Sequence, residues 1–572
     1  MLRLPTVLFI VLAGCTETVR LADDPLESLV SIEIAPSDST IKITDLALPH
    51  HTLQFIAMGR FSDNTIRDIT SLVEWKLDNG LLGVFDASGL FTASHAAAGY
   101  ATVSIESRGL VAETKLTVII DATIIDPAFP PPAANLFDPS IPFVTGDPLR
   151  SPMLVYPADE TLFPQSIAST LFQYQLGSSN DAFRIVFDSE VLHLAVETGS
   201  DRWQADGTVQ RLLAATGVTA PIRAEVQAAS STQMPATIYI GNRITLQFSL
   251  DAPGGPLYFW SAATNGIMAG GVEAPTSGKL YPVSTTCVGC HTISRDGLQM
   301  AMATGTTPTS AELLSINVGD FTTVIPATPA RPMGWATYSP DGTKLLVANN
   351  GQLRLYLADS GAALGSVTLP PMRYATHPDW SPDGTYVAVA LTSQVPTSTD
   401  VRTASIARIP YNDGAWGTPE ILVSGSMMSN NYFPRYSPDG SYLAYVNATT
   451  ASQGAVSAEL RIVPAAGGMA RRLRIASHRL GTIDDVPDLA SSMPAWAPKG
   501  INAMPGDRTW LAFVSARPYG AVLPTAGRGQ IWVTSVDLES TGDPSTAAFW
   551  LPCQDSTVRN SNPIWSKTDV TF

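Results

Sequence analysis

Apolar and polar residues alternate along much of the chain in short runs, with turn-forming residues between the runs. Such runs cover residues 30–34, 53–57, 101–105 and 114–118. A period of two predicts strands with one buried and one exposed face, because successive side chains of a strand point to opposite sides. Many short strands separated by turns predict an all-β chain, and residues 28–120 are expected to form a β-sandwich.

The first sandwich resembles a known domain family. The stretch from Phe61-Ser62-Asp63-Asn64 to Val73-Glu74-Trp75, followed by residues 84–93, is similar to the bacterial Ig-like domain, group 2. The similarity covers nearly all of residues 28–120. The similarity implies a spacer or adhesive module. No residue in this segment points to a chemical activity.

A second β-domain is expected after a linker rich in proline. Residues 121–149 contain Pro127, Pro130, Pro131 and Pro132, and such a segment is stiff and extended. Residues 150–250 again show short alternating runs and predict an Ig-like or fibronectin-III-like β-domain. A short helix is expected over residues 209–215.

One five-residue pattern recurs in the C-terminal half. Clear copies occupy residues 338–342, 380–384 and 436–440, and degenerate copies occur at 293–297, 496–500 and 564–567. Ser-Pro-Asp-Gly favours a type I turn, because proline presets φ at the second position and glycine tolerates the exit. Six copies about 42–69 residues apart predict a six-bladed β-propeller over residues 256–572.

The two ends of this region complement each other. The last copy stops at the chain end without outer strands, and unpaired apolar runs precede the first copy at residues 256–260 and 266–270. We therefore expect residues 256–273 to complete the blade begun at 560–572, because a ring needs shared strands to remove its sheet edges.

The repeat resembles that of the TolB-like propeller family over roughly residues 256–572. The resemblance implies a propeller that binds other proteins or peptides through its central channel. It favours the fold strongly and the function weakly, because one fold hosts many functions.

Four cysteines are too few for a disulfide framework, and two of them form a motif. Cys287-Val288-Gly289-Cys290-His291 matches C-x-x-C-H, the attachment signature of c-type haem. Two thiols at this spacing reach both vinyl groups of one haem edge, and the adjacent imidazole then binds the iron. We expect one covalent haem c, with thioethers to Cys287 and Cys290 and with His291 as proximal ligand.

Three alternatives to haem attachment fit the same motif. The two thiols would also suit a redox or structural disulfide, or a zinc site, although a second pair of zinc ligands is missing. A chance occurrence in a structural strand is the third alternative. The motif runs directly into Ser294-Arg295-Asp296-Gly297, an arrangement that resembles other exported propeller proteins.

Alignment of the repeats places Cys290 at a position shared by all six copies. The equivalent residues should ring one mouth of the channel; they are Trp335, His377, Phe433, Met493 and Asn562. A haem there would take its distal ligand from His377 or Met493, although each of the two also suits ordinary core packing. Cys553 has no partner in the sequence and is expected to be a buried thiol.

The N-terminus is typical of an export signal. Arg3 precedes an apolar run too short to span a bilayer, and the run ends in Leu12-Ala13-Gly14-Cys15. This ending resembles the bacterial lipobox, which implies a signal peptide over residues 1–15, a lipid on Cys15 and a tether over residues 16–27. By the same resemblance, Thr16 after the cysteine favours the outer membrane.

The formal net charge of −16 argues against binding to nucleic acid. The leading expectation is a lipid-anchored haem protein for electron transfer or redox sensing outside the cytoplasm, with a protein or redox partner. The alternative is a scaffold that binds protein or glycan, with the two thiols as a disulfide. A hydrolase or lyase is a third class, but the sequence contains no nucleophile elbow, phosphate loop or zinc-protease helix.

Overall fold

The computed structural model describes residues 24–48, 51–130, 135–279, 287–305, 310–452, 454–477, 489–499, 508–525 and 527–567. Within these residues the chain forms 44 strands and two α-helices of 11 and 4 residues, which confirms the all-β class. Residues 1–23, including the predicted lipidation site Cys15, lie outside the described part. Among the residues described, no helix has the length and apolar character needed to cross a membrane.

The chain divides into two compact units. The first comprises Met1–Ile41, Pro49–Ser94 and Tyr100–Val118, and the second comprises Lys42–Leu48, His95–Gly99 and Ile119–Phe572. In the first unit the burial of β9 alternates residue by residue, as the period of two predicts. The strands of this unit are β1 (Leu29–Ala35), β2 (Ser39–Ile43), β3 (Thr52–Gln54), β4 (Ile56–Phe61), β5 (Ile66–Asp68), β6 (Glu74–Leu77), β7 (Gly83–Phe85), β8 (Leu90–Ala93), β9 (Gly99–Ser107) and the first part of β10 (Leu110–Ile125).

The first unit is held together by an aromatic core. The rings of Trp75 and Phe85 stack with centroids 5.2 Å apart, and the ring of Phe55 meets Phe85 edge-on at 5.4 Å. Such pairs contribute beyond their buried area. Two short 3₁₀ helices, Thr70–Leu72 and Gly80–Leu82, connect the strands around this core.

The second unit opens with a sheet in the order β11-β19-β18-β15-β16-β10 and a smaller sheet in the order β12-β14-β17. The helix predicted at 209–215 is present as α1 (Gly207–Gly217), and the Asp206 carboxylate caps it by accepting hydrogen bonds from the N–H groups of Thr208 and Val209. The strands are β11 (Phe143–Thr145), β12 (Met153–Tyr156), β13 (Thr161–Pro164), β14 (Leu171–Gln175), β15 (Ala182–Asp188), β16 (Leu192–Thr198), β17 (Arg202–Gln204), β18 (Ile222–Ala229) and β19 (Ile238–Ser249).

Two features of this region differ from the expectation. β10 pairs in parallel with β16, and β19 pairs in parallel with both β11 and β13. The sequence did not predict these directions, because alternation along a strand does not distinguish a parallel from an antiparallel neighbour. The proline-rich segment is not an extended linker throughout. Its described part includes β11 and buries Phe137 beside Ala182 and Ile238, because apolar residues are interspersed among its prolines.

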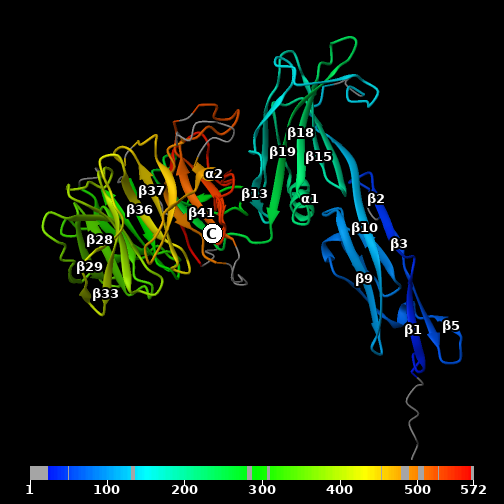
Figure 1. Cartoon of the computed structure of the whole chain (residues 1–572), viewed down its shortest axis with the longest axis horizontal. Coiled ribbons are helices and arrows are strands. Elements are labelled where there is room, and N and C mark those ends of the chain that lie inside the picture. The colour runs from blue at the N-terminus through cyan, green and yellow to red at the C-terminus, as the bar shows by residue number, and fades with distance from the viewer. Residues whose placement is uncertain are drawn as a thin grey trace, which may run out of the picture. The chain divides into compact units, whose positions relative to one another are not determined.

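Six antiparallel sheets follow and form the blades of a propeller (Figure 1, green to red). Blade 1 contains β23 (Cys287–Ile293), β24 (Gln299–Gly305), β25 (Glu312–Asn317) and β26 (Thr323–Ile325). Blade 2 contains β27 (Trp335–Tyr338), β28 (Lys344–Asn349), β29 (Gln352–Leu357) and β30 (Ala363–Ser366). Blade 3 contains β31 (Tyr374–Trp380), β32 (Tyr386–Thr392), β33 (Ser405–Asn412), β34 (Ala415–Trp416) and β35 (Glu420–Val423).

The remaining blades have the same plan. Blade 4 contains β36 (Asn430–Tyr436), β37 (Tyr442–Ala448), β38 (Glu459–Pro464) and β39 (Arg471–Arg472), followed by the short helix α2 (Arg474–Ser477). Blade 5 contains β40 (Ser492–Trp496), β41 (Thr509–Ser515), β42 (Gln530–Val536) and β43 (Phe549–Trp550). Blade 6 contains β44 (Asn560–Trp565), β20 (Leu257–Ser261), β21 (Gly266–Gly270) and β22 (Gly278–Lys279).

The propeller closes as predicted. β44, the last strand among the described residues, pairs antiparallel with β20, so that Leu257 faces Trp565 and Ser261 faces Asn560. The strands β23, β27, β31, β36, β40 and β44 contact one another in that order, and β44 contacts β23. The first strands of the blades therefore form a closed ring.

The repeated Ser-Pro-Asp-Gly segment forms the predicted turn. In the copy at 381–384 the Gly384 N–H donates to the Ser381 carbonyl at 3.1 Å, and the Ser381 hydroxyl donates to the Asp383 carboxylate at 2.6 Å. Gly384 has φ of +77°, a left-handed conformation that favours glycine. The copies at 294–297, 339–342 and 437–440 make the same two bonds, while the turns of the last two copies run into residues outside the described part.

Replacing Gly384 by alanine should lower the free energy of unfolding of the propeller by about 1–2 kcal/mol, because a Cβ is strained at positive φ. The nearest atom to the added Cβ is Pro340 Cγ at 3.7 Å, which is an ordinary contact, so the loss would come from the backbone. Urea unfolding followed by tryptophan fluorescence measures it. Gly319→Ala is the matched control, since a Cβ there meets nothing within 4 Å and no positive φ is required. Equal midpoints for the two variants would contradict the prediction.

Candidate functional site

The C-x-x-C-H motif lies on β23, the strand of blade 1 that belongs to the central ring. Gly289 pairs with Ala303 and Thr292 pairs with Ala301, so Cys290 and His291 together oppose one residue of β24. This is a β-bulge, and Cys290 adopts φ of +44° within it. Cys287 faces Gly305 in the same strand pair, and its side chain lies outside the described part.

The same bulge recurs in five of the six blades. The residues with positive φ are Cys290, His377, Phe433, Met493 and Asn562, with values between +44° and +53°. Each sits at a register shift of the first strand of its blade. These are the positions that the repeat alignment made equivalent, which confirms the alignment. Trp335, the sixth member, starts β27 in a regular pair with Ala348.

The second residue of the bulge explains why strand pairing tolerates the deformation. It is proline in four blades, at Pro378, Pro434, Pro494 and Pro563, and proline has no N–H to donate to the neighbouring strand. Blade 1 has His291 at this position instead. The histidine of the motif therefore replaces a proline of the repeat, and the imidazole is the feature that distinguishes blade 1.

A cavity of about 640 Å³ brings the bulge residues together. Its lining includes Cys290, Trp335, Phe433, Met493 and Asn562, five of the six predicted positions. The volume lies in the range of small-molecule sites. The rings of Trp335 and Phe433 meet edge-on with centroids 5.0 Å apart and form an aromatic part of the wall.

The lining of this cavity also contains uncharged polar residues, namely Ser398, Thr399, Ser452, Ser492, Ser561 and Asn562. Trp260 also lines the cavity, and its Nε1 is buried without a hydrogen bond, while the exposed Arg559 is the one cationic side chain among the described lining residues. The indole N–H of Trp335 is used elsewhere, since it donates to the Ser398 carbonyl at 2.9 Å. The cavity therefore suits a mainly apolar molecule with an anionic or hydrogen-bonding edge.

His291 is almost fully buried and does not line the cavity. Its Nδ1 lies 3.2 Å from Nδ2 of Asn562, and its Nε2 is buried without a well-formed hydrogen bond. Burial lowers the pKa of His291 to about 4; the backbone of Tyr258 opposes the shift and the charge of Arg435 adds to it. The ring is therefore neutral at pH 7, the state in which a histidine binds a metal.

The two predicted distal ligands differ in their placement. Met493 lines the cavity with Cys290. His377 is 2% exposed and packs against Phe433, with ring centroids 3.9 Å apart, and it is absent from the lining. Burial, and then the charge of Arg435, hold the pKa of His377 well below its ordinary value. The structure brings Met493 and Cys290 to one cavity, but not His377.

Sequence reasoning missed a charged cluster farther along the same strands. Arg435 Nη1 lies 3.2 Å from the Asp379 carboxylate, which also accepts a hydrogen bond from the Tyr436 N–H at 2.7 Å. Arg295 lines the same small cavity, of about 150 Å³, and donates to the Trp380 carbonyl. Asp379 and Arg435 directly follow Pro378 and Pro434, so a charged residue after the proline in these two repeats would have been the signal.

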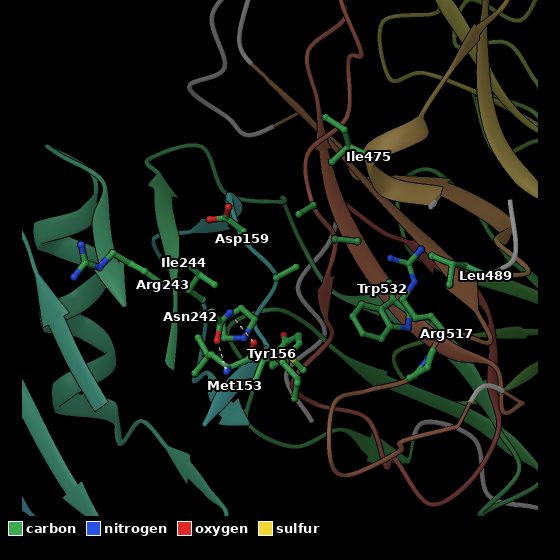
Figure 2. A pocket seen from close by; sticks show the side chains of 17 residues that line it. Met153, Tyr156, Asp159, Asn242, Arg243, Ile244, Ile475, Leu489, Arg517 and Trp532 are labelled. Carbon is green, nitrogen blue, oxygen red and sulfur yellow. Dashed lines mark hydrogen bonds between the residues drawn. The ribbon is translucent and has the colours of Figure 1, made fainter. Parts of the chain in front are cut away.

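Another cavity, of about 720 Å³, lies between the strands around β12 and β19 and blade 5 (Figure 2). The guanidinium of Arg517 lies 4.9 Å from the ring of Trp532, and Tyr156 lines the same cavity. The carboxylate of Asp159 accepts hydrogen bonds from the N–H groups of Glu160 and Thr245. Its described lining contains no cysteine or histidine, so the predicted chemistry is not located there.

Cys553 is buried and forms no disulfide, as predicted. Burial raises the pKa of its thiol to about 12, against the weaker effect of the Gly271 backbone. A Cβ on Gly270 would come within 2.6 Å of its sulfur, so the thiol fills a tight packing position. In the part of the chain that the structure describes, no group of three or more His, Cys, Asp or Glu residues is arranged to hold a metal ion.

No protein-family model and no curated protein sequence matches the chain. Among solved structures, TolB from Acinetobacter baumannii matches at 13% identity and a TM-score of 0.36, over 60% of this chain and 79% of that one. A protein assigned as TolB from Agrobacterium tumefaciens matches at 16% identity and a TM-score of 0.31, over 52% and 89%. The dihydro-heme d1 dehydrogenase NirN in complex with DHE matches at 15% identity and a TM-score of 0.32, over 52% and 54%. At these values the fold assignment depends on the sheet topology of the chain itself.

Iodoacetamide should modify Cys290 and spare Cys553 in folded, reduced protein made without haem. The thiolate is the reactive form, and a thiol with a raised pKa stays protonated at pH 7–8. Peptide mass spectrometry before and after denaturation measures the labelling of each cysteine. Cys553→Ala identifies the peptide concerned. Equal labelling of both cysteines in the folded protein would show that Cys553 is not buried.

Proposed function

We propose that the chain is an exported, TolB-like propeller lipoprotein that carries one covalent haem c at Cys287 and Cys290 and serves electron transfer or redox sensing. The observation that carries the proposal is the bulge of blade 1. It places Cys290 on an apolar cavity and puts next to it a buried, neutral imidazole whose Nε2 lacks a well-formed hydrogen bond. Lipidation at Cys15 and attachment to the outer membrane belong to the same proposal.

The residues present fit such a group. The cavity is largely apolar, and Cys290 reaches it from one wall. His291 would hold the iron through Nε2, which makes no hydrogen bond of good geometry, in competition with the backbone of Tyr258. Because the imidazole does not line the cavity, its ring would have to turn toward the cavity for His291 to hold the iron. The bound haem would supply one-electron chemistry.

The surrounding side chains would determine how the group is held. Trp335 and Phe433 would form an aromatic wall that keeps water from the group. Burial and the Arg435 charge keep the imidazole of His291 neutral, which preserves its lone pair. Arg559, the one cationic side chain among the described lining residues, would pair with a carboxylate of the porphyrin.

The alternative function is a recognition scaffold for protein or glycan in which Cys287 and Cys290 form a disulfide. The cavity with its aromatic wall would then bind an apolar group of the partner. The two functions differ in one measurable property, the presence of porphyrin on the mature chain.

Protein expressed with the haem c attachment machinery should stain for haem peroxidase on a denaturing gel and show one added porphyrin by mass spectrometry. The double variant Cys287→Ala/Cys290→Ala should lose the stain completely, because both thioethers are removed. Cys553→Ala is the control and should keep it, since Cys553 lies at a separate packing site. A colourless wild-type band without porphyrin mass would end the haem proposal and favour the scaffold.

Met493→Ala should open the sixth coordination position of the iron, so that the reduced protein binds carbon monoxide. His377→Phe should not, because His377 is packed among aromatic rings outside the cavity. A carbon monoxide difference spectrum of each loaded variant measures this. Binding by His377→Phe but not by Met493→Ala would assign the distal ligand to His377 instead.

A further inference from the structure

We infer that blade 2 carries a binding site for a doubly charged oxyanion, a phosphate or sulfate group, between the guanidinium groups of Arg331 and Arg354. The site is a cavity of about 420 Å³ beside β30 and β29, of which β29 is labelled in Figure 1. This blade 2 cavity shares no described lining residue with the cavity that contains Cys290, so the inference does not depend on haem.

The charge of the blade 2 cavity differs from that of the rest of the chain. The chain has 50 aspartates and glutamates against 34 lysines and arginines, and ten other arginines form an ion pair with a carboxylate. The described lining of the blade 2 cavity contains Arg331 and Arg354 but no acidic residue. Neither of them forms an ion pair within the described part of the chain. Two positive charges therefore share one cavity that has no carboxylate in its described lining.

Backbone carbonyls hold Arg331 in the connection between blades 1 and 2. Its Nη1 donates to the Gly361 carbonyl at 3.4 Å, and its Nη2 donates to the Pro326 carbonyl at 3.1 Å. Gly361 has φ of +67°, and a Cβ there would lie 3.4 Å from the Arg331 Cζ, so the guanidinium packs against this turn. Each Nη carries a second N–H. Because a carbonyl has no net charge, these contacts orient the guanidinium and leave its charge for an anion.

Arg354 reaches the blade 2 cavity from β29. It pairs with Ser366 of β30, and Tyr356 follows two residues later, on the same face of β29. Arg354 is exposed, and its one described hydrogen bond, from Nη2 to the Gln352 Oε1, is long at 3.5 Å. Tyr356 and Ser366 also line the cavity, and a serine hydroxyl can donate a hydrogen bond. β29 and β30 therefore supply a second cation and a neutral donor.

These groups match an anion with two negative charges. Guanidinium N–H groups form paired hydrogen bonds with the oxygens of a phosphate, and two guanidinium groups balance a dianion. A phosphate ester carries close to two negative charges at neutral pH. The cavity volume lies in the range of small-molecule sites, so there is also space for a body that carries the anionic group. A free oxyanion, a sugar phosphate and a lipid head group share this chemistry.

Titration of the whole chain with three probes tests the inference and distinguishes these sources. The probes are inorganic phosphate, glucose 6-phosphate with glucose as its neutral reference, and vesicles of phosphatidylcholine with or without phosphatidic acid. Calorimetry measures the first two and co-sedimentation measures the third. At least one probe should bind, and Arg354→Gln should weaken its binding by about tenfold or more, because a charge-assisted contact is lost. Arg331→Gln should have the same effect, and Arg354→Gln keeps the test decisive if loss of the carbonyl contacts prevents folding.

Arg373→Gln is the matched control. Arg373 is exposed and does not line the blade 2 cavity, so its substitution removes the same charge and should leave the binding unchanged. Circular dichroism confirms that each variant folds. The inference would be overturned if no probe bound, if glucose bound as tightly as glucose 6-phosphate, or if Arg354→Gln bound as tightly as Arg373→Gln.

Discussion

The antiparallel pairing of β20 with β44 is the contact on which the propeller depends. Without it, blade 6 would lose its channel-facing strand, and the backbone of β20 would have an unpaired edge. The pairing also brings the last strand against β23, next to the cysteine motif. The shape of the cavity, the surroundings of His291 and the position of Asn562 all follow from this single closure.

Much of the fold was predictable because the decisive signals are local. Ser, Asp and Gly each have a role in the same turn, and proline presets φ in three of its copies, so the copies of the turn count the blades and reveal the shared blade. The same alignment predicted five of the residues that line the cavity. The parallel pairs of β10 and β19 were not predictable, because alternation along one strand says nothing about the direction of its neighbour.

The orientation of the site residues depends on contacts between distant segments, and the sequence pattern does not contain them. A C-x-x-C-H motif identifies potential donors, but the burial of His291 results from packing against blade 6. His377 turned out to pack against Phe433 rather than line the cavity. The Asp379–Arg435 pair joins blades 3 and 4, and its positive member affects both histidines.

The repeated bulge has a consequence for how this mouth of the ring varies. Five blades present one side chain each from the same left-handed backbone shape, although the five residues are Cys, His, Phe, Met and Asn. The backbone at these points is therefore insensitive to the identity of the side chain. Side chains that bind a ligand can therefore be substituted at each of these positions separately, and the sheet of each blade stays intact.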